Sequence, residues 1–160
     1  TMLYYSLIHP FLIYGLIVWG NTYKTTLSRI TNLQKKALRI ISFSKFDYPS
    51  SPLFKSLQII KFSDLVSLEI ALFMFDFHNK KLVPTIFSDF FPPISNTHFY
   101  NTRLASKSTY SLPKPRTNYG KFNICFSGPK LWNSIPEEIK SKLSKFSFKK
   151  HLKSFFINSY

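Results

Sequence analysis

The sequence predicts a mostly α-helical fold, with a small helical bundle, an irregular basic connector and a smaller C-terminal helical unit. Apolar residues recur at helical spacing in three long stretches of the chain. Residues 92–121 have no such period and are rich in Pro, Ser, Thr and Asn, which favours a loop. The composition, 44% hydrophobic and 18% aromatic, supplies enough apolar surface for a core. We therefore expect the bundle over residues 1–91, the connector over 92–121 and the C-terminal unit over 122–160.

Residues 2–20 contain no charged side chain. A charge-free run of about 18 residues is long enough to be a candidate membrane span. His9, Pro10 and several tyrosines argue against a span, and proline ends or kinks a helix. The preferred interpretation is two short buried helices that are hinged at Pro10 and closed by Gly20. A membrane segment is the alternative.

An amphipathic helix is expected over residues 25–41, where the apolar positions follow the helical period. Its outer face carries Arg29, Lys35, Lys36 and Arg39. The apolar positions assigned to the core are Leu27, Ile30, Leu33, Ala37, Leu38 and Ile41.

A loop and a second long helix follow. Residues 42–52 contain two prolines and an aspartate and predict a loop, after which Pro52 suits the first turn of a short helix to residue 58. Ser63 has the character of an N-cap, and the helix that it begins extends to residue 78. This helix is apolar on nearly every side, so we place it at the centre of the core.

The connector alternates positive charges with aromatic rings. Arginine forms the better phosphate contact, because its guanidinium can bind two oxygens at once. The rings have two possible roles, which are stacking on unpaired bases and packing on the helical core. The cations are Arg103, Lys107, Lys114, Arg116 and Lys121, and the aromatic residues are Phe99, Tyr100, Tyr110 and Tyr119.

The last forty residues are predicted to be helical again. Residues 122–132 are apolar, and Ser134 and Glu137 have the spacing of a capping box. The final helix is expected over residues 145–157. One face of it carries Phe148, Leu152, Phe155 and Phe156, and the other carries Lys149, Lys150 and Lys153.

Catalytic chemistry is not expected of this chain. Its aspartates are scattered, whereas two-metal sites need clustered carboxylates. The histidines lack metal-ligand spacing, and Cys125 stands alone in an apolar run, which is typical of a small core residue. We therefore predict no catalytic residue, no metal site and no cofactor.

The charge balance predicts a polyanionic partner. The chain has 22 Lys and Arg against 7 Asp and Glu, a formal net charge of +15. Nucleic acid is the leading candidate and an acidic membrane surface the rival, while any single lysine also suits a solvated face. The residues expected to contact phosphates are Arg29, Lys35, Lys36, Arg39, Arg103, Lys107, Arg116, Lys121, Lys149, Lys150 and Lys153.

Several segments together resemble one protein family. Residues 3–20, with Tyr14-Gly15 and Trp19-Gly20, and Leu33-Gln-Lys-Lys-Ala-Leu-Arg-Ile-Ile41 are similar to the segment after the polymerase palm in reverse transcriptases of non-LTR (LINE-type, jockey-like) retrotransposons. The C-terminal part is similar in Tyr100-Asn-Thr-Arg103, Arg116-Thr-Asn-Tyr-Gly-Lys121, Gly128-Pro-Lys-Leu-Trp-Asn-Ser-Ile-Pro136 and Phe148-Lys-Lys-His-Leu-Lys153.

The resemblance implies a fragment of an RNA-directed DNA polymerase. Residues 1–91 would form a helical thumb that grips the template–primer duplex, and a C-terminal extension would follow. The palm and its magnesium-binding aspartates would lie before Thr1, so the chain alone should be inactive. The implied partners are RNA, DNA or their hybrid and the missing polymerase core, with no small-molecule substrate, in the nucleus or cytoplasm. The alternatives are a membrane-associated protein anchored by residues 2–20 and a structural interaction module that does not bind nucleic acid.

Overall fold

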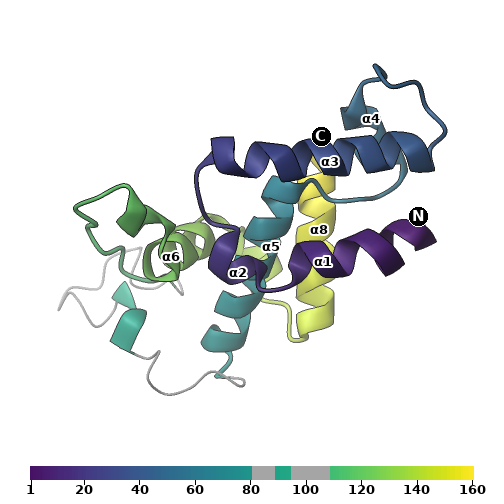
Figure 1. Cartoon of the computed structure of the whole chain (residues 1–160). Coiled ribbons are helices and arrows are strands. Elements are labelled where there is room, and N and C mark those ends of the chain that lie inside the picture. The colour runs from purple at the N-terminus through teal and green to yellow at the C-terminus, as the bar shows by residue number, and fades with distance from the viewer. Residues whose placement is uncertain (81–88, 95–108) are drawn as a thin grey trace. The chain divides into compact units, whose positions relative to one another are not determined.

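The fold is mostly α-helical, as the sequence predicts (Figure 1). The computed structural model describes residues 1–80, 89–94 and 109–160. In these ranges the extended pairing is limited to an isolated antiparallel bridge between Pro93 and Tyr110. All the long periodic stretches of the sequence are helices.

The chain divides into two compact units. The first contains residues 1–69 and 149–160, and the second contains residues 70–148. Two helices, α5 (Phe62–His78) and α8 (Lys145–Asn158), each contribute residues to both units. These bounds differ from the segments expected over 1–91, 92–121 and 122–160, because the last helix belongs largely with the N-terminal ones.

The chain stays helical through Pro10, where the sequence predicts a hinge. A π-helical turn, η1 (Tyr4–Ile8), continues directly into α1 (His9–Ile13), which holds Pro10 in its first turn. The His9 N–H donates to the Tyr4 carbonyl, five residues earlier. Proline has no N–H to donate and its ring crowds the preceding turn, and a wider π turn accommodates both constraints. The prediction of a hinge at Pro10 is therefore wrong.

The break falls at Gly15 instead. Its φ of +60° lies in the left-handed region that favours glycine, and α2 (Leu16–Trp19) begins after it. Gly20 ends α2 with a right-handed φ of −73°, so it is not a left-handed stop. A Cβ on Gly20 would lie 2.6 Å from the Leu16 carbonyl oxygen and 3.0 Å from Val66 Cγ2. Close packing, rather than backbone freedom, therefore requires glycine at this position.

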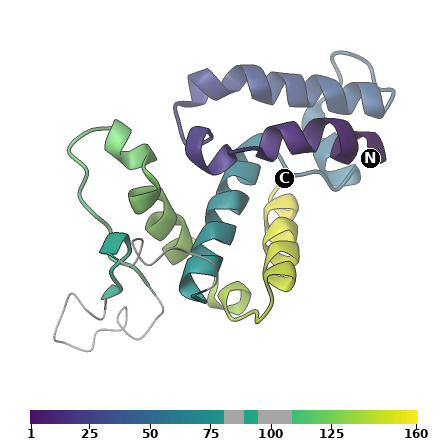
Figure 2. The same cartoon turned by 60° about the horizontal axis from the view of Figure 1, so that its bottom comes forward.

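The two helices predicted next are present as α3 (Lys24–Ile41) and α4 (Ser50–Ser56). Within the first unit, α1 and α3 lie side by side and run in opposite directions (Figure 1, Figure 2). The core between these helices and the start of α5 is strongly apolar. Its fully buried members are Tyr4, Leu38, Phe54 and Ile59, and Tyr5, Ile8, Leu12, Ile41, Leu57 and Tyr160 pack against them.

A buried amide joins three segments of the first unit. Gln34, on the inner face of α3, is only 2% exposed. Its Nε2 donates to the Tyr4 hydroxyl (2.7 Å) and to the Ile60 carbonyl (3.0 Å). Its Oε1 accepts a hydrogen bond from the Phe62 N–H at 2.9 Å. Because these bonds satisfy the amide on both ends, it can be buried without a net penalty.

The C-terminal residue caps the N-terminus of α5. The Tyr160 hydroxyl accepts a hydrogen bond from the Lys61 N–H (2.9 Å) and donates to Asp64 Oδ2 (2.7 Å). Lys61 Nζ lies 4.0 Å from the centroid of the same ring. Burial raises the pKa of Tyr160, so the hydroxyl stays protonated. Ser63, the predicted N-cap, lies within the helix, and that prediction is wrong.

Aromatic stacking organises the core of the second unit. Trp132, on α6 (Ile124–Ser134), is completely buried. Phe148 lies between it and Phe75, with ring centroids 6.0 Å from Trp132 and 4.6 Å from Phe75. Core packing therefore accounts for Trp132 within residues 128–136.

Asn133, which follows Trp132, forms two hydrogen bonds with the backbone of Tyr110. Asn133 Oδ1 accepts from the Tyr110 N–H (3.0 Å), and Asn133 Nδ2 donates to the Tyr110 carbonyl (2.9 Å). The Tyr110 hydroxyl lies 2.9 Å from His78 Nδ1. Burial raises the pKa of Tyr110 to about 12. Of the two roles considered for this ring, packing on the helical core is confirmed.

The capping box predicted at Ser134 and Glu137 does not form. Ser134 Oγ donates to the Leu131 carbonyl at the end of α6 (2.7 Å). Glu137 begins α7 (Glu137–Lys140) and accepts from Lys140 Nζ at 2.9 Å. The Lys140 side chain is buried over Trp132. A buried ammonium group is costly unless it is paired, so the Glu137 carboxylate binds Lys140 and does not form a capping box with Ser134.

The Gln34 amide leads to a first prediction. Gln34→Leu should lower the free energy of unfolding by about 2–4 kcal/mol, because it leaves the Phe62 N–H and the Tyr4 hydroxyl without this buried partner. Urea unfolding measures the loss. Asn32→Leu, at an exposed position of the same helix, is the matched control and should change stability by less than about 0.5 kcal/mol. Equal losses in the two variants would contradict the assignment.

Candidate nucleic-acid interface

Positive charge is spread over both units. Each contains eleven Lys and Arg, against three acids in the first unit and four in the second. Among the described residues, the ion pairs are Lys140 with Glu137 and Lys145 with Asp76. Both belong to the second unit, and neither involves a cation predicted to contact phosphate.

The outer face of α3 presents cations and apolar side chains together. Arg29 and Lys36 are exposed and lie seven residues apart, which is about two helical turns. Leu33 and Ile40 occupy the same face, and Leu33 is 63% exposed. The prediction that Leu33 belongs to the core is therefore wrong, since the buried side of α3 is centred on Gln34 and Leu38 instead.

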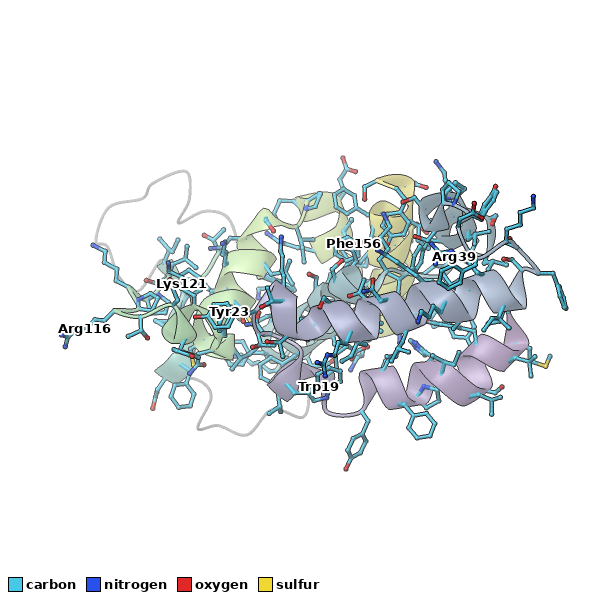
Figure 3. The ribbon with its side chains drawn as sticks, turned by 45° about the horizontal axis from the view of Figure 1, so that its top comes forward. Trp19, Tyr23, Arg39, Arg116, Lys121 and Phe156 are labelled. Atoms are coloured by element: carbon cyan, nitrogen blue, oxygen red, sulfur yellow. The ribbon has the colours of Figure 1, made fainter. Side chains whose placement is uncertain are left out.

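Lys35 and Arg39 flank this face and are half-buried. Arg39 Nε donates to the Tyr48 carbonyl at 2.8 Å, and its guanidinium lies 6.0 Å from the Phe46 ring centroid. Figure 3 shows Arg39 on the C-terminal half of α3, toward the loop that follows the helix. Arg39 therefore holds this loop, and a guanidinium has further N–H donors for a ligand.

The second group of predicted cations lies on α8. Lys149 and Lys150 are exposed, whereas Lys153 is half-buried. Lys153 Nζ donates to the Tyr5 hydroxyl at 2.8 Å and lies 5.2 Å from the centroid of that ring. On the apolar side of the helix, Phe148 and Leu152 are fully buried as predicted, but Phe155 is about half exposed.

His9 lies in the same unit as these lysines, and their charges affect its pKa. His9 is half-buried, and its Nδ1 has no hydrogen-bond partner within the described residues. Burial lowers the pKa of His9, and the charges of Lys149 and Lys153 lower it further. The sequence predicts no role for His9 or Tyr5 at this surface. Their spacing of four residues places them on one side of a helix, but their position beside α8 depends on the tertiary fold.

The third group lies on the loop before α6. Lys114, Arg116 and Lys121 are exposed. Arg116 extends away from the ribbon, and Lys121 lies on the same loop (Figure 3). Two further predicted contacts, Arg103 and Lys107, fall outside the described residues. Of the predicted contacts, the first unit contains Arg29, Lys35, Lys36, Arg39, Lys149, Lys150 and Lys153, and the second contains Arg116 and Lys121.

The described ranges contain no group of three or more His, Cys, Asp or Glu side chains that could hold a metal ion. Cys125 is half-buried, and burial raises the pKa of its thiol. None of the helices within the described ranges has both the length and the apolar character that crossing a bilayer requires.

Comparison with family models, with curated proteins and with solved structures gives no match to this chain.

His9 leads to a second prediction. Its pKa is lowered on folding, so the unfolded chain binds a proton near pH 6.5 and the folded chain only at lower pH. The free energy of unfolding should therefore fall as the pH drops through 6.5 toward the folded pKa, and then level off. His9→Phe should remove this part of the pH dependence.

Urea unfolding of both proteins at a series of pH values makes the comparison. His78, whose pKa burial also lowers, keeps its own contribution in the variant. Identical pH dependence in the two proteins would show that His9 is not held in the neutral form.

Proposed function

We propose that the chain binds the sugar–phosphate backbone of a template–primer duplex, with an RNA–DNA hybrid as the expected ligand. In this proposal it is the thumb-like, palm-less part of a retrotransposon reverse transcriptase. The observation that carries the proposal is the exposed basic face of α3, with Arg29 and Lys36 on one side of a helix that the core holds in place.

The spacing of these cations supports contacts to separate phosphates. Residues seven apart on a helix are separated by about 10.5 Å along its axis. That distance is about one Debye length at 0.1 M salt, so the two cations are largely screened from each other and both can contact phosphates at once. Phosphate contacts carry no sequence information directly, and binding should therefore be non-sequence-specific.

The lysines of α8 belong to the same unit and add to its positive charge. Lys149 and Lys150 are exposed. The metal-binding carboxylates of polymerisation would be supplied by the palm and not by this chain. Such a role places the protein in the nucleus or cytoplasm.

The proposal leads to a prediction about salt. If about five phosphates are contacted, the logarithm of the binding constant should fall with the logarithm of salt concentration at a slope near −4 to −5. Arg29→Glu with Lys36→Glu should weaken binding and reduce this slope by about 2, because two phosphate contacts are lost. Fluorescence anisotropy with a labelled RNA–DNA hybrid measures both quantities.

The matched control changes the net charge equally at other sites. Lys80→Glu with Lys130→Glu replaces two exposed lysines that lie outside the three basic groups. It should lower affinity less than the α3 variant does. A wild-type slope near zero, or equal effects of the two double variants, would refute the proposal.

A specific observation favours one second candidate, which is peripheral binding to an anionic bilayer. Within the charge-free residues 2–20, Phe11 is 81% exposed and Val18 is 83% exposed, and Leu7 is exposed as well. Apolar side chains on interfacial helices enter the headgroup region, while nearby lysines attract anionic lipid. The exposed Lys149 and Lys150 lie in the same unit.

Flotation separates the two candidates. Bilayer binding predicts that the protein floats with vesicles containing phosphatidylserine, that it does so less with phosphatidylcholine alone, and that Phe11→Ser abolishes flotation. The nucleic-acid proposal predicts that Phe11→Ser leaves hybrid binding unchanged. A protein that stays at the bottom of the gradient with both kinds of vesicle is inconsistent with the bilayer candidate.

A further inference from the structure

We infer that the loop formed by residues 114–122 is a binding site for an unpaired nucleic-acid strand, in which one base stacks on Tyr119 while Arg116 and Lys121 contact the flanking phosphates. The inference rests on the proposed function and extends it, because it assigns a second site with a different form of nucleic acid as its ligand. The site belongs to the second unit, whereas α3 belongs to the first.

The loop is held in one conformation by its own contacts. Its last turn is a 3₁₀ helix, η4 (Tyr119–Phe122). The Thr117 hydroxyl accepts a hydrogen bond from the Gly120 N–H at 3.2 Å. A Cβ on Gly120 would come within 2.8 Å of Pro115 Cβ, so the chain folds tightly back on itself at this point. A ligand would therefore meet a loop whose shape is already formed, which reduces the entropy cost of binding.

Tyr119 is presented to solvent by this loop. Its side chain is 74% exposed. The Phe122 ring supports it in an edge-to-face arrangement, with centroids 6.5 Å apart and an interplanar angle of 83°. Tyr110, from the same predicted connector, is instead buried and bonded to His78 and Asn133. Of these two tyrosines, Tyr119 is the one whose ring a base can reach.

Cations are close to Tyr119 along the chain, and acids are distant from it along the chain. Lys114, Arg116 and Lys121 are exposed and lie within five residues of Tyr119. No Asp or Glu occurs in the sequence between Asp89 and Glu137.

Two of these cations have properties suited to phosphate. Lys121 Nζ donates to Asn118 Oδ1 at 3.0 Å, which orients the ammonium group and leaves its other N–H groups for a phosphate. The Arg116 guanidinium can bind a phosphate through two parallel hydrogen bonds.

An exposed aromatic ring together with cations on the same loop favours an unpaired strand as the ligand. In a duplex both faces of each base are covered by its neighbours, so a tyrosine ring cannot stack on them. In a single strand the base faces are accessible, and stacking on an aromatic side chain tolerates any base. The loop therefore has the two elements of single-strand binding sites, an aromatic platform and cations that follow the backbone.

The test compares single-strand and duplex binding of the full chain. The probes are a short fluorescent oligodeoxythymidine and an RNA–DNA hybrid of equal length. Tyr119→Ala should weaken oligodeoxythymidine binding about tenfold, and Tyr119→Phe should retain wild-type affinity because the ring is preserved. The salt slope should not change in either variant, since no charge is lost. Arg116→Glu should weaken binding and lower the slope.

Tyr14→Ala is the matched control, because Tyr14 is 85% exposed and lies in the charge-free residues 2–20. It should leave oligodeoxythymidine binding unchanged. Urea unfolding of Tyr119→Ala checks that the variant is folded, as expected for an exposed position. Wild-type affinity in Tyr119→Ala, an equal loss in Tyr14→Ala, or no oligodeoxythymidine binding by the wild-type chain would each overturn the inference.

The outcomes also separate this inference from the proposed function. If Tyr119→Ala weakens single-strand binding while the α3 double variant leaves hybrid binding unchanged, the loop site stands and the duplex interface fails. If the α3 double variant weakens hybrid binding while Tyr119→Ala changes nothing, the reverse holds.

Discussion

The hydrogen bonds of the Gln34 amide connect the N-terminal helix, α3 and the start of α5, and the orientation of α3 depends on them. A buried amide that lost its partners would cost more than the bonds contribute when they are made, so the side chain is restricted to one position. With Gln34 facing inward, the helical period determines which side of α3 meets solvent. Arg29 and Lys36 then lie on the outer face. A neutral buried residue thus sets the direction in which the positive charges of the helix are displayed.

Three of the seven acids of the chain are engaged in structural contacts. Asp64 accepts from the C-terminal Tyr160, Asp76 pairs with Lys145, and Glu137 pairs with the buried Lys140. Carboxylates used in this way do not neutralise the exposed cations of α3 and α8. An excess of surface charge destabilises a compact state by self-repulsion and raises the rate of encounter with a polyanion. The same distribution therefore opposes folding and favours binding.

Side chains of similar type have different roles within the second unit. The contacts of Trp132 with Phe148 and of Asn133 with Tyr110 are those of a core. Tyr110 is part of that core, while Tyr119 remains on the surface among cations. Packing accounts for the first two residues without any ligand. Tyr119 contacts the Phe122 ring but keeps 74% of its side chain exposed, and this difference in burial separates it from Tyr110.

The sequence by itself determined the helical class, the extents of α3, α5 and α8, and the basic faces of α3 and α8. The reason is that apolar periodicity is a local property, and helix geometry converts it directly into faces.

The tertiary structure alone decided the features that depend on remote partners. The cap of α5 comes from Tyr160, Lys153 packs on Tyr5, and the burial of Gln34 depends on Ile60 and Phe62. Local patterns predicted a hinge at Pro10 and a cap at Ser63, and both were wrong. A π turn carries the helix through Pro10, and α5 begins before Ser63, where the Tyr160 hydroxyl accepts from the Lys61 N–H. Backbone hydrogen-bonding requirements can be inferred from sequence, whereas the partner that meets them is selected by which segments the fold brings together.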